Sequence, residues 1–171
     1  MKRSLVALLL VAGFGLAQRP SPPAETSVSI NGKTISIKYS APSLRGRQAF
    51  GPNGIISKDA TYPVWRAGAN NATALHTDAD LMIGDLRVPA GNYTLFVDTS
   101  ASPWQLIVNK QTGQWGLTYN KSQDLGRVPM KVTKPSAPVE TYKMTLTSEG
   151  NKGKLELAWE NVDATVDFMV H

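Results

Sequence analysis

The sequence predicts an all-β protein: a single antiparallel β-sandwich, or a flattened barrel, of about 8–10 short strands that follows a cleaved signal peptide. Three observations support this prediction. Short segments of alternating apolar and polar residues recur along the chain, and turn sequences rich in Gly, Pro and Asn separate them. After the N-terminal segment, no window of about 11 or more residues has a helical apolar period, and no alternation of strands with helices indicates a parallel sheet.

The N-terminal segment, MKRSLVALLLVAGFGLA at residues 1–17, is typical of a secretory signal peptide. Lys2 and Arg3 precede an apolar run, and small residues lead up to a cleavage site after Ala17. The apolar run, about a dozen residues, is shorter than the roughly 20 residues that a transmembrane helix needs. We therefore expect a periplasmic or secreted protein with no retained membrane span.

Composition limits the function further. The sequence has no cysteine, so disulfides are excluded and the domain must be stabilised by packing. The formal net charge is +5, of which Lys2 and Arg3 contribute two, and the other basic residues are scattered along the chain. This pattern does not favour a nucleic-acid partner.

Residues 18–25, QRPSPPAE, are predicted to be a flexible, proline-rich leader, and residues 26–171 a single β domain. The domain opens with two alternating runs, 26–30 and 34–39, on either side of Asn-Gly-Lys. Asn-Gly between such runs predicts a tight β-hairpin.

Residues 40–63 form a long segment rich in Gly, Pro and polar residues. Loops of this length in a compact domain are typically functional or disordered. Alternating runs then return, separated by the turn sequences PAGN, NKQTG and EGNKG. The predicted strands are 72–77, 80–84, 86–98, 104–109, 140–148, 154–160 and 165–170.

The alternation also predicts the core, because side chains two residues apart share a face of a strand. Phe96 points away from the core face of its own strand, which indicates that this strand is covered on both sides. Three same-face sets are predicted to be buried: Tyr93, Leu95 and Val97; Trp104, Leu106 and Val108; Leu155, Leu157 and Trp159.

Five motifs in order carry a family resemblance: SLRGRQAFG at 43–51, VWRAGANNAT at 64–73, PAGNYTLFV at 89–97, WQLIVNKQTGQWG at 104–116 and LELAWEN at 155–161. With these motifs the chain resembles the bacterial secreted family catalogued as domain of unknown function 2911 (DUF2911). The resemblance implies a secreted or periplasmic all-β domain and supplies no catalytic residues. Asn71 departs from the family pattern, which more usually has glutamate there.

Arg66, in YPVWRAGANNAT at 62–73, is the first candidate site residue. An arginine beside an aromatic residue can stack on the ring and offer five donors to a carboxylate, a phosphate or backbone carbonyls. One hypothesis is a cationic pocket for an acidic small molecule, formed with Arg45 and Arg47 of the long segment. The other is a structural lock in which Arg66 satisfies loop carbonyls, and Asn70 fits either hypothesis.

Trp115 is the second candidate. It lies in GQWGLTYN beside a turn, where a partly exposed ring is expected, and flat rings with neighbouring Asn and Gln donors suit sugars.

His76 supports an alternative, a cell-envelope hydrolase, because His76 and Asp78 share a face of an extended strand. The other histidine is the last residue, so no second imidazole is placed to complete a transition-metal site. No nucleophile elbow, cysteine nucleophile or phosphate-binding glycine loop is present in the sequence.

We therefore interpret the chain as a non-catalytic domain that binds a small polar or anionic ligand without a cofactor or metal. The predicted contacts are Arg45, Arg47, Arg66, Asn70 and Trp115. The hydrolase stays open as an alternative, as does a protein-interaction module that binds another envelope protein through strand edges or the long segment.

Overall fold

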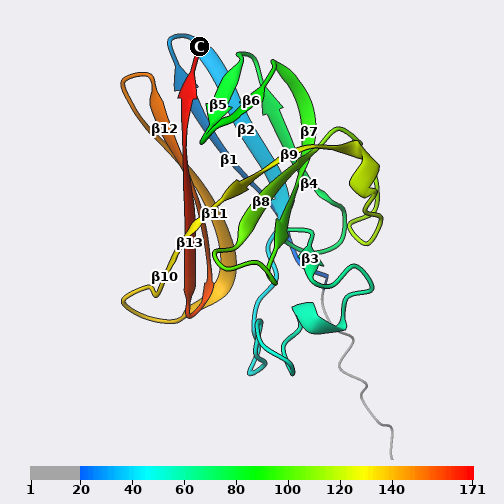
Figure 1. Ribbon diagram of the computed structural model, residues 1–171. Helices are drawn as coiled ribbons and strands as arrows, with labels where there is room; N and C mark the ends of the chain where they lie inside the picture. The colour runs from blue at the N-terminus through cyan, green and yellow to red at the C-terminus, as the bar shows by residue number, and fades with distance from the viewer. Residues whose placement is uncertain (1–19) are drawn as a thin grey trace, which may run out of the picture.

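The computed structural model describes residues 20–171, which form two antiparallel β-sheets packed face to face (Figure 1). Sheet I has the strand order β1-β2-β4-β7-β8-β9 with β3 paired to β7; sheet II has the order β11-β12-β13-β5-β6 with β10 paired to β13. The sheets do not close into a barrel, so the sandwich is confirmed and the barrel alternative is excluded. The predicted signal peptide, residues 1–17, lies outside the described residues.

The strands of sheet I are β1 (Pro23–Ile30), β2 (Lys33–Ser40), β3 (Val64–Trp65), β4 (Thr73–Thr77), β7 (Gly91–Asp98), β8 (Gln105–Asn109) and β9 (Asp124–Pro129). The strands of sheet II are β5 (Leu81–Ile83), β6 (Leu86–Val88), β10 (Lys131–Thr133), β11 (Val139–Glu149), β12 (Lys152–Glu160) and β13 (Val162–Val170). Two short 3-10 helices, η1 (Ile56–Lys58) and η2 (Lys121–Gln123), lie in connections.

The described part of the chain holds more strands than the sequence predicts, because β3, β9 and β10 were not predicted and one predicted strand is divided. The predicted strand 86–98 is in fact two strands in different sheets, β6 in sheet II and β7 in sheet I. The chain passes between the sheets at Pro89 and Ala90, where proline cannot donate a ladder hydrogen bond.

The leader prediction is wrong at its C-terminal end, because β1 begins at Pro23 and pairs with Ser40 of β2. Proline is tolerated there as the first residue of an edge strand. The hairpin prediction is confirmed. Asn31 and Gly32 between β1 and β2 have φ of 52° and 74°, the left-handed pair that a type I′ turn requires.

The predicted core faces are buried, with Trp104 half-buried. Phe96 is 0% exposed although it lies on the opposite face of β7. There it forms a second apolar cluster with Val64 and Ile107, and the Tyr119 ring packs over it with 5.0 Å between centroids. The β8–β9 connection therefore covers the outer face of sheet I, as the position of Phe96 predicted.

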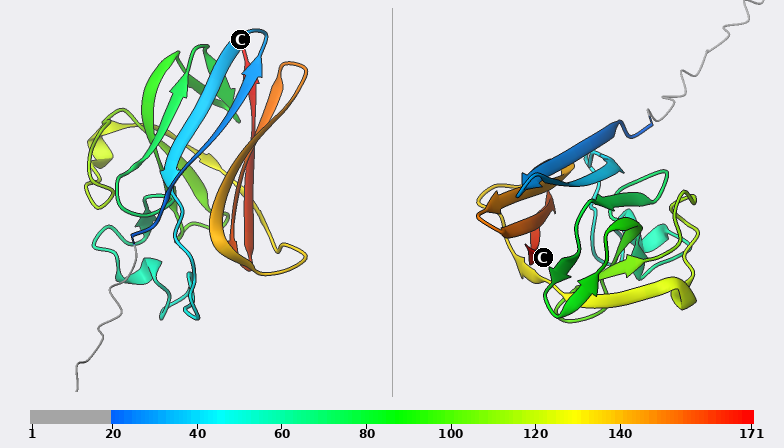
Figure 2. Two further views of the ribbon diagram at one scale, coloured as in Figure 1. Left: turned by 180° about the vertical axis from the view of Figure 1, so that it is seen from behind. Right: turned by 90° about the horizontal axis from the view of Figure 1, so that it is seen from above.

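The long segment, predicted at 40–63, begins after Ser40, the last residue of β2, and lies at one end of the sandwich (Figure 2). Two carboxylate hydrogen bonds hold it, because Glu160 Oε2 accepts from the backbone N–H groups of Ala49 (2.8 Å) and Phe50 (3.2 Å). Phe50 packs against three tryptophan rings with centroids 5.1–5.9 Å away: Trp65, Trp104 and Trp159. This part of the segment therefore has a packing role.

The edge of β11 is covered by sheet I and the loop that follows β2. Three successive outward N–H groups of β11 have acceptors there: Tyr142 donates to Pro42 O (2.8 Å), Met144 to Tyr39 Oη (3.1 Å) and Leu146 to Thr26 Oγ1 (3.0 Å). These donors are not available to pair with a strand of another protein.

Candidate functional site

The β3–β4 connection, residues 66–72, is a tight turn that points consecutive side chains in opposite directions. Trp65 is 1% exposed and packs in the core, where its Nε1 donates to Gly68 O at 3.1 Å. Ala67 and Asn70 have φ of 50° and 58°. A Cβ on Gly68 would lie 2.8 Å from a backbone oxygen of β2, so only glycine fits there. Arg66 is thereby directed away from the core.

The Arg66 side chain, 14% exposed, has three partners inside the protein. Its Nη1 donates to Asn70 O at 3.1 Å, its Nη2 lies 3.5 Å from Asp59 Oδ1, and its Cζ lies 5.8 Å from the centroid of the Trp115 ring. Its Nε is buried without a hydrogen-bond partner among the described residues. Burial raises the pKa of Asp59, and the Arg66 charge opposes that rise. These contacts favour the structural-lock hypothesis for Arg66.

Trp115 lies in the β8–β9 connection, which pairs with the β3–β4 connection. Asn71 and Trp115 form an isolated antiparallel bridge, and the Gly116 N–H donates to Asn70 O at 3.0 Å. A Cβ on Gly116 would overlap the Arg66 side chain and Asn70 O. Trp115 is nevertheless 52% exposed. The protein thus holds an exposed indole ring against a fixed guanidinium.

The two asparagines of the connection differ in role. Asn70 closes the turn, since its left-handed backbone is one that asparagine tolerates and its Nδ2 donates to Ser21 O at 3.3 Å. Asn71 is exposed and its side chain makes no hydrogen bond to another described residue. Asn71 is not among the predicted contacts, but of the two asparagines it is the one whose side chain is available to a ligand.

Arg45 and Arg47 have partners other than those of Arg66. The Arg47 guanidinium donates to Leu44 O at 2.9 Å and Ser43 O at 3.0 Å, and the Arg45 backbone N–H donates to Glu140 at 2.8 Å. The structure brings together Arg66, Asn70 and Trp115. No contact among the described residues joins Arg45 or Arg47 to them.

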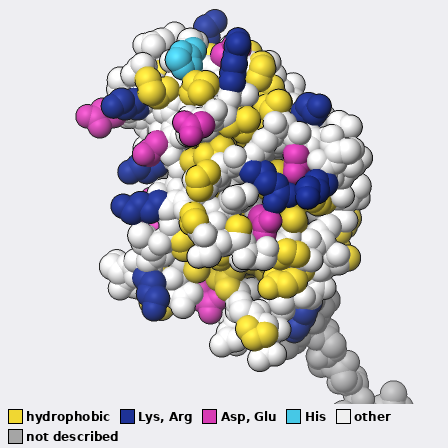
Figure 3. All heavy atoms as spheres, viewed as in Figure 1, with side chains coloured by type: hydrophobic (Ala, Val, Ile, Leu, Met, Phe, Trp, Pro, Cys, Tyr) yellow, Lys and Arg dark blue, Asp and Glu magenta, His cyan; other side chains and the backbone are white. Residues whose placement is uncertain are grey.

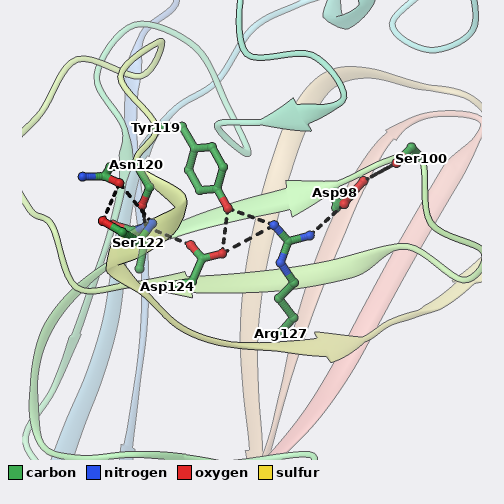
Figure 4. Close-up of polar contacts among 8 residues, drawn as sticks. Asp98, Ser100, Tyr119, Asn120, Ser122, Asp124 and Arg127 are labelled. Carbon is green, nitrogen blue, oxygen red and sulfur yellow. Dashed lines mark hydrogen bonds and ion pairs between the residues drawn. The ribbon is translucent and has the colours of Figure 1, made fainter.

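A polar network on the outer face of sheet I was not predicted (Figure 4). Arg127 of β9 is at its centre: Nη1 donates to Asp98 Oδ2 at 2.8 Å, and Nη2 donates to Tyr119 Oη at 2.9 Å and lies 3.4 Å from Asp124 Oδ2. Tyr119 in turn donates to Asp124 at 2.7 Å, and Asp124 also accepts from Asn109 at 2.9 Å. The network fastens the connection that carries Trp115 to the sheet.

Burial shapes the protonation of this network. Burial and the neighbouring Asp124 carboxylate raise the pKa of Tyr119 to about 12. Burial alone would raise the pKa of Asp98, but hydrogen bonds from Ser100 and Arg127 outweigh it and lower that pKa. The sequence signal for the network was Phe96, because an apolar residue on an outer face means that something covers it.

His76 is exposed on the outer face of sheet I. Its Nδ1 lies 2.8 Å from Asn92 Oδ1 and its Nε2 lies 2.9 Å from Asp78 Oδ1. Both hydrogen bonds, the one to Asn92 first, raise its pKa. Among residues 20–171 no group of three or more His, Cys, Asp or Glu side chains could hold a metal ion.

The rest of the surface has no single charged patch in the view of Figure 3, where Lys and Arg lie at separate places with Asp and Glu between them. Two shallow grooves of about 560 and 620 Å³ adjoin and share Gly84, Lys154 and Asp167; the first is lined by sheet II, and the second also by β9 of sheet I. Their charged residues have both signs, so they favour no ligand class. No helix within the described range is long and apolar enough to span a membrane.

Comparison with known proteins identifies a family. A search of curated proteins and a search of solved structures returned no match. The family model described as "Protein of unknown function (DUF2911)" matches residues 21–168. This range includes every strand from β1 to β12, most of β13, and Arg66, Asn70, Asn71 and Trp115. The chain therefore belongs to the DUF2911 family.

Proposed function

We propose that this protein is a non-catalytic, secreted or periplasmic binding domain whose small polar ligand contacts Trp115. One observation carries the proposal: Trp115 is 52% exposed, yet backbone pairing to Asn71 and the Arg66 guanidinium fix its position. A large ring held rigidly in solvent loses little entropy when a ligand covers it. Free surface rings without such support are less suited to binding.

Among the predicted contacts, the geometry favours Trp115 as the residue that touches the ligand. Arg66 and Asn70 hold the loops around Trp115 in place and do not contact the ligand in this proposal. Their polar groups are already bonded within the protein, those of Arg66 to Asn70 O and Asp59 and that of Asn70 to Ser21 O. The Arg47 guanidinium is bonded to Leu44 O and Ser43 O and the Arg45 backbone N–H to Glu140, so these contacts lie outside this surface.

The hydrolase alternative has less support. A general base needs a nitrogen within reach of a nucleophile or a water. Both ring nitrogens of His76 already face Asn92 and Asp78. The interaction-module alternative is likewise not favoured at the β11 edge, where sheet I and the loop after β2 occupy three donors, or at the β9 edge, which ends in Pro129.

The proposal is tested by thermal unfolding of the purified protein in the presence of a panel of sugars, carboxylates, phosphates and nucleotides. A ligand that binds only the native state raises the melting temperature by mass action. We expect at least one compound to do so, to lose its effect in Trp115→Ala, and to keep it in Val132→Ala. Val132 is also an exposed apolar residue, 39% exposed, but lies on β10. A panel without any shift would contradict the proposal.

A further inference from the structure

We infer that the ligand is a neutral saccharide that stacks on the face of Trp115 turned away from Arg66 and hydrogen-bonds to Asn71. This inference rests on the proposed function and specifies the ligand class. Arg66 lies over one face of the ring, 5.8 Å from its centroid, so the remaining exposed surface includes the other face. Pyranose rings present a face of C–H groups that suits the flat, electron-rich face of an indole.

Asn71 is placed beside that ring by the backbone. In an antiparallel pair, directly opposite residues have side chains on the same side, with Cβ atoms about 5 Å apart. Asn71 and Trp115 are such a pair, and the Asn71 amide is exposed without a partner among the described residues. An amide both donates and accepts, which matches the hydroxyl groups at the edge of a sugar ring.

The charges at the site favour a neutral ligand over an anion. Arg66 is the cation in contact with Trp115, and its Nη1 and Nη2 are directed to Asn70 O and Asp59. Its Nε is buried and the whole side chain is only 14% exposed, so little of the guanidinium can reach a phosphate or carboxylate. The ion pair with Asp59 also offsets its positive charge.

The surroundings favour a saccharide over a protein partner. Protein interfaces centre on aromatic anchors surrounded by further contacts that exclude water. Within five residues of Trp115 along the chain, the other exposed residues are polar or small, namely Lys110, Thr112, Gly113, Thr118 and Asn120. Apart from Trp115, the large apolar side chains that are exposed in residues 20–171 are Tyr62, Val132 and Met169, and the last two belong to sheet II.

Tryptophan fluorescence provides a direct test, because the protein has four tryptophans and the other three are buried or half-buried. Acrylamide quenching therefore reports mainly on Trp115. Neutral hexasaccharides of β-1,4-glucose, β-1,4-N-acetylglucosamine, α-1,4-glucose and β-1,4-mannose would be titrated against the purified protein. At least one should protect Trp115 from quenching and shift its emission to shorter wavelength.

Variants then locate the site. Trp115→Ala should weaken binding of that saccharide by about tenfold or more, measured by calorimetry, whereas Trp115→Phe, which keeps a ring, should weaken it less. Asn71→Ala should weaken binding and Asn71→Asp, which keeps only acceptors, should not restore it. Val132→Ala and Met169→Ala should bind as the parent does. Binding that survives Trp115→Ala would overturn the site.

The inference and the proposed function fail differently. Suppose that no hexasaccharide binds but that a phosphate, carboxylate or nucleotide raises the melting temperature through Trp115. The inferred ligand class is then wrong, whereas the proposed binding function is supported. If neither panel contains a ligand, both are contradicted.

Discussion

The guanidinium of Arg66 lies over the indole ring of Trp115, with 5.8 Å between Arg66 Cζ and the ring centroid. The two residues come from different connections of sheet I, between β3 and β4 and between β8 and β9. The ring contact joins these two connections, the hydrogen bond to Asn70 O stays within the β3–β4 connection, and the ion pair reaches Asp59 of the long segment.

Arg66→Ala should lower the free energy of unfolding by about 2 kcal/mol or more, because it removes packing between two loops and leaves Asp59 buried without its cation. Urea unfolding measures this change. Lys110→Ala, which removes an exposed cation from the β8–β9 connection, should change the free energy by no more than about 0.5 kcal/mol. Equal effects of the two substitutions would contradict the lock.

Tyr119→Phe should destabilise the β8–β9 connection, because the hydroxyl bonds both Asp124 and Arg127. Hydrogen bonds to charged groups contribute about 1.5–3 kcal/mol, so we expect a loss of about 1.5 kcal/mol in urea unfolding. The variant should also lack the tyrosine that titrates at pH about 12 in an ultraviolet absorbance titration. Tyr62→Phe, at a ring that is 49% exposed, is the matched control and should unfold as the parent does.

Phe50→Ala should lower the free energy of unfolding by about 3 kcal/mol, because the ring packs against three tryptophans at the end of the sandwich. The near-ultraviolet circular dichroism of those tryptophans should weaken as well. Gln48→Ala, an exposed neighbour in the same segment, should change neither measurement. If Phe50→Ala left stability unchanged, the segment would have no packing role.

The His76 pKa should lie above its ordinary value of 6.5 in an NMR titration, because the imidazolium donates to both Asn92 and Asp78. Asn92→Ala and Asp78→Ala should each lower it, because each removes a hydrogen bond to the ring, and Asp78→Ala also removes a nearby negative charge. Lys38 opposes the rise. Because the folded-state pKa of His76 is raised, protonation of His76 stabilises the folded protein. This stabilisation is fully present below the unfolded-state pKa and is lost as pH rises through the folded-state pKa. A His76 pKa that neither substitution lowers would contradict this account.

The sequence predicted those parts of the fold that depend on neighbours along the chain. Asn31-Gly32 predicted the hairpin, because a type I′ turn needs two residues in the left-handed conformation. That requirement depends only on the residues of the turn. The alternation around Phe96 predicted burial on both faces of β7, since side-chain direction has a period of two residues. It did not predict the break at Pro89, because whether a run continues in one sheet or crosses to the other depends on what packs against it.

The candidate site could be predicted only in part. Arg66 and Trp115 could be chosen separately from their types and neighbours, whereas their contact depends on how two loops meet across β7 and β8. Arg47 could not be excluded from the sequence, because only the folded loop shows its guanidinium bonded to Leu44 O and Ser43 O.

By itself, the sequence determined an all-β chain with no disulfides, the faces of its strands and a short set of candidate residues. The tertiary structure decided which of those residues meet, that Arg66 supports the ring from behind, and that Arg127, Asp98, Tyr119 and Asp124 form a network. The reason is physical: side-chain direction is a local property of the backbone, whereas the partner of a polar group is fixed by contacts between distant segments.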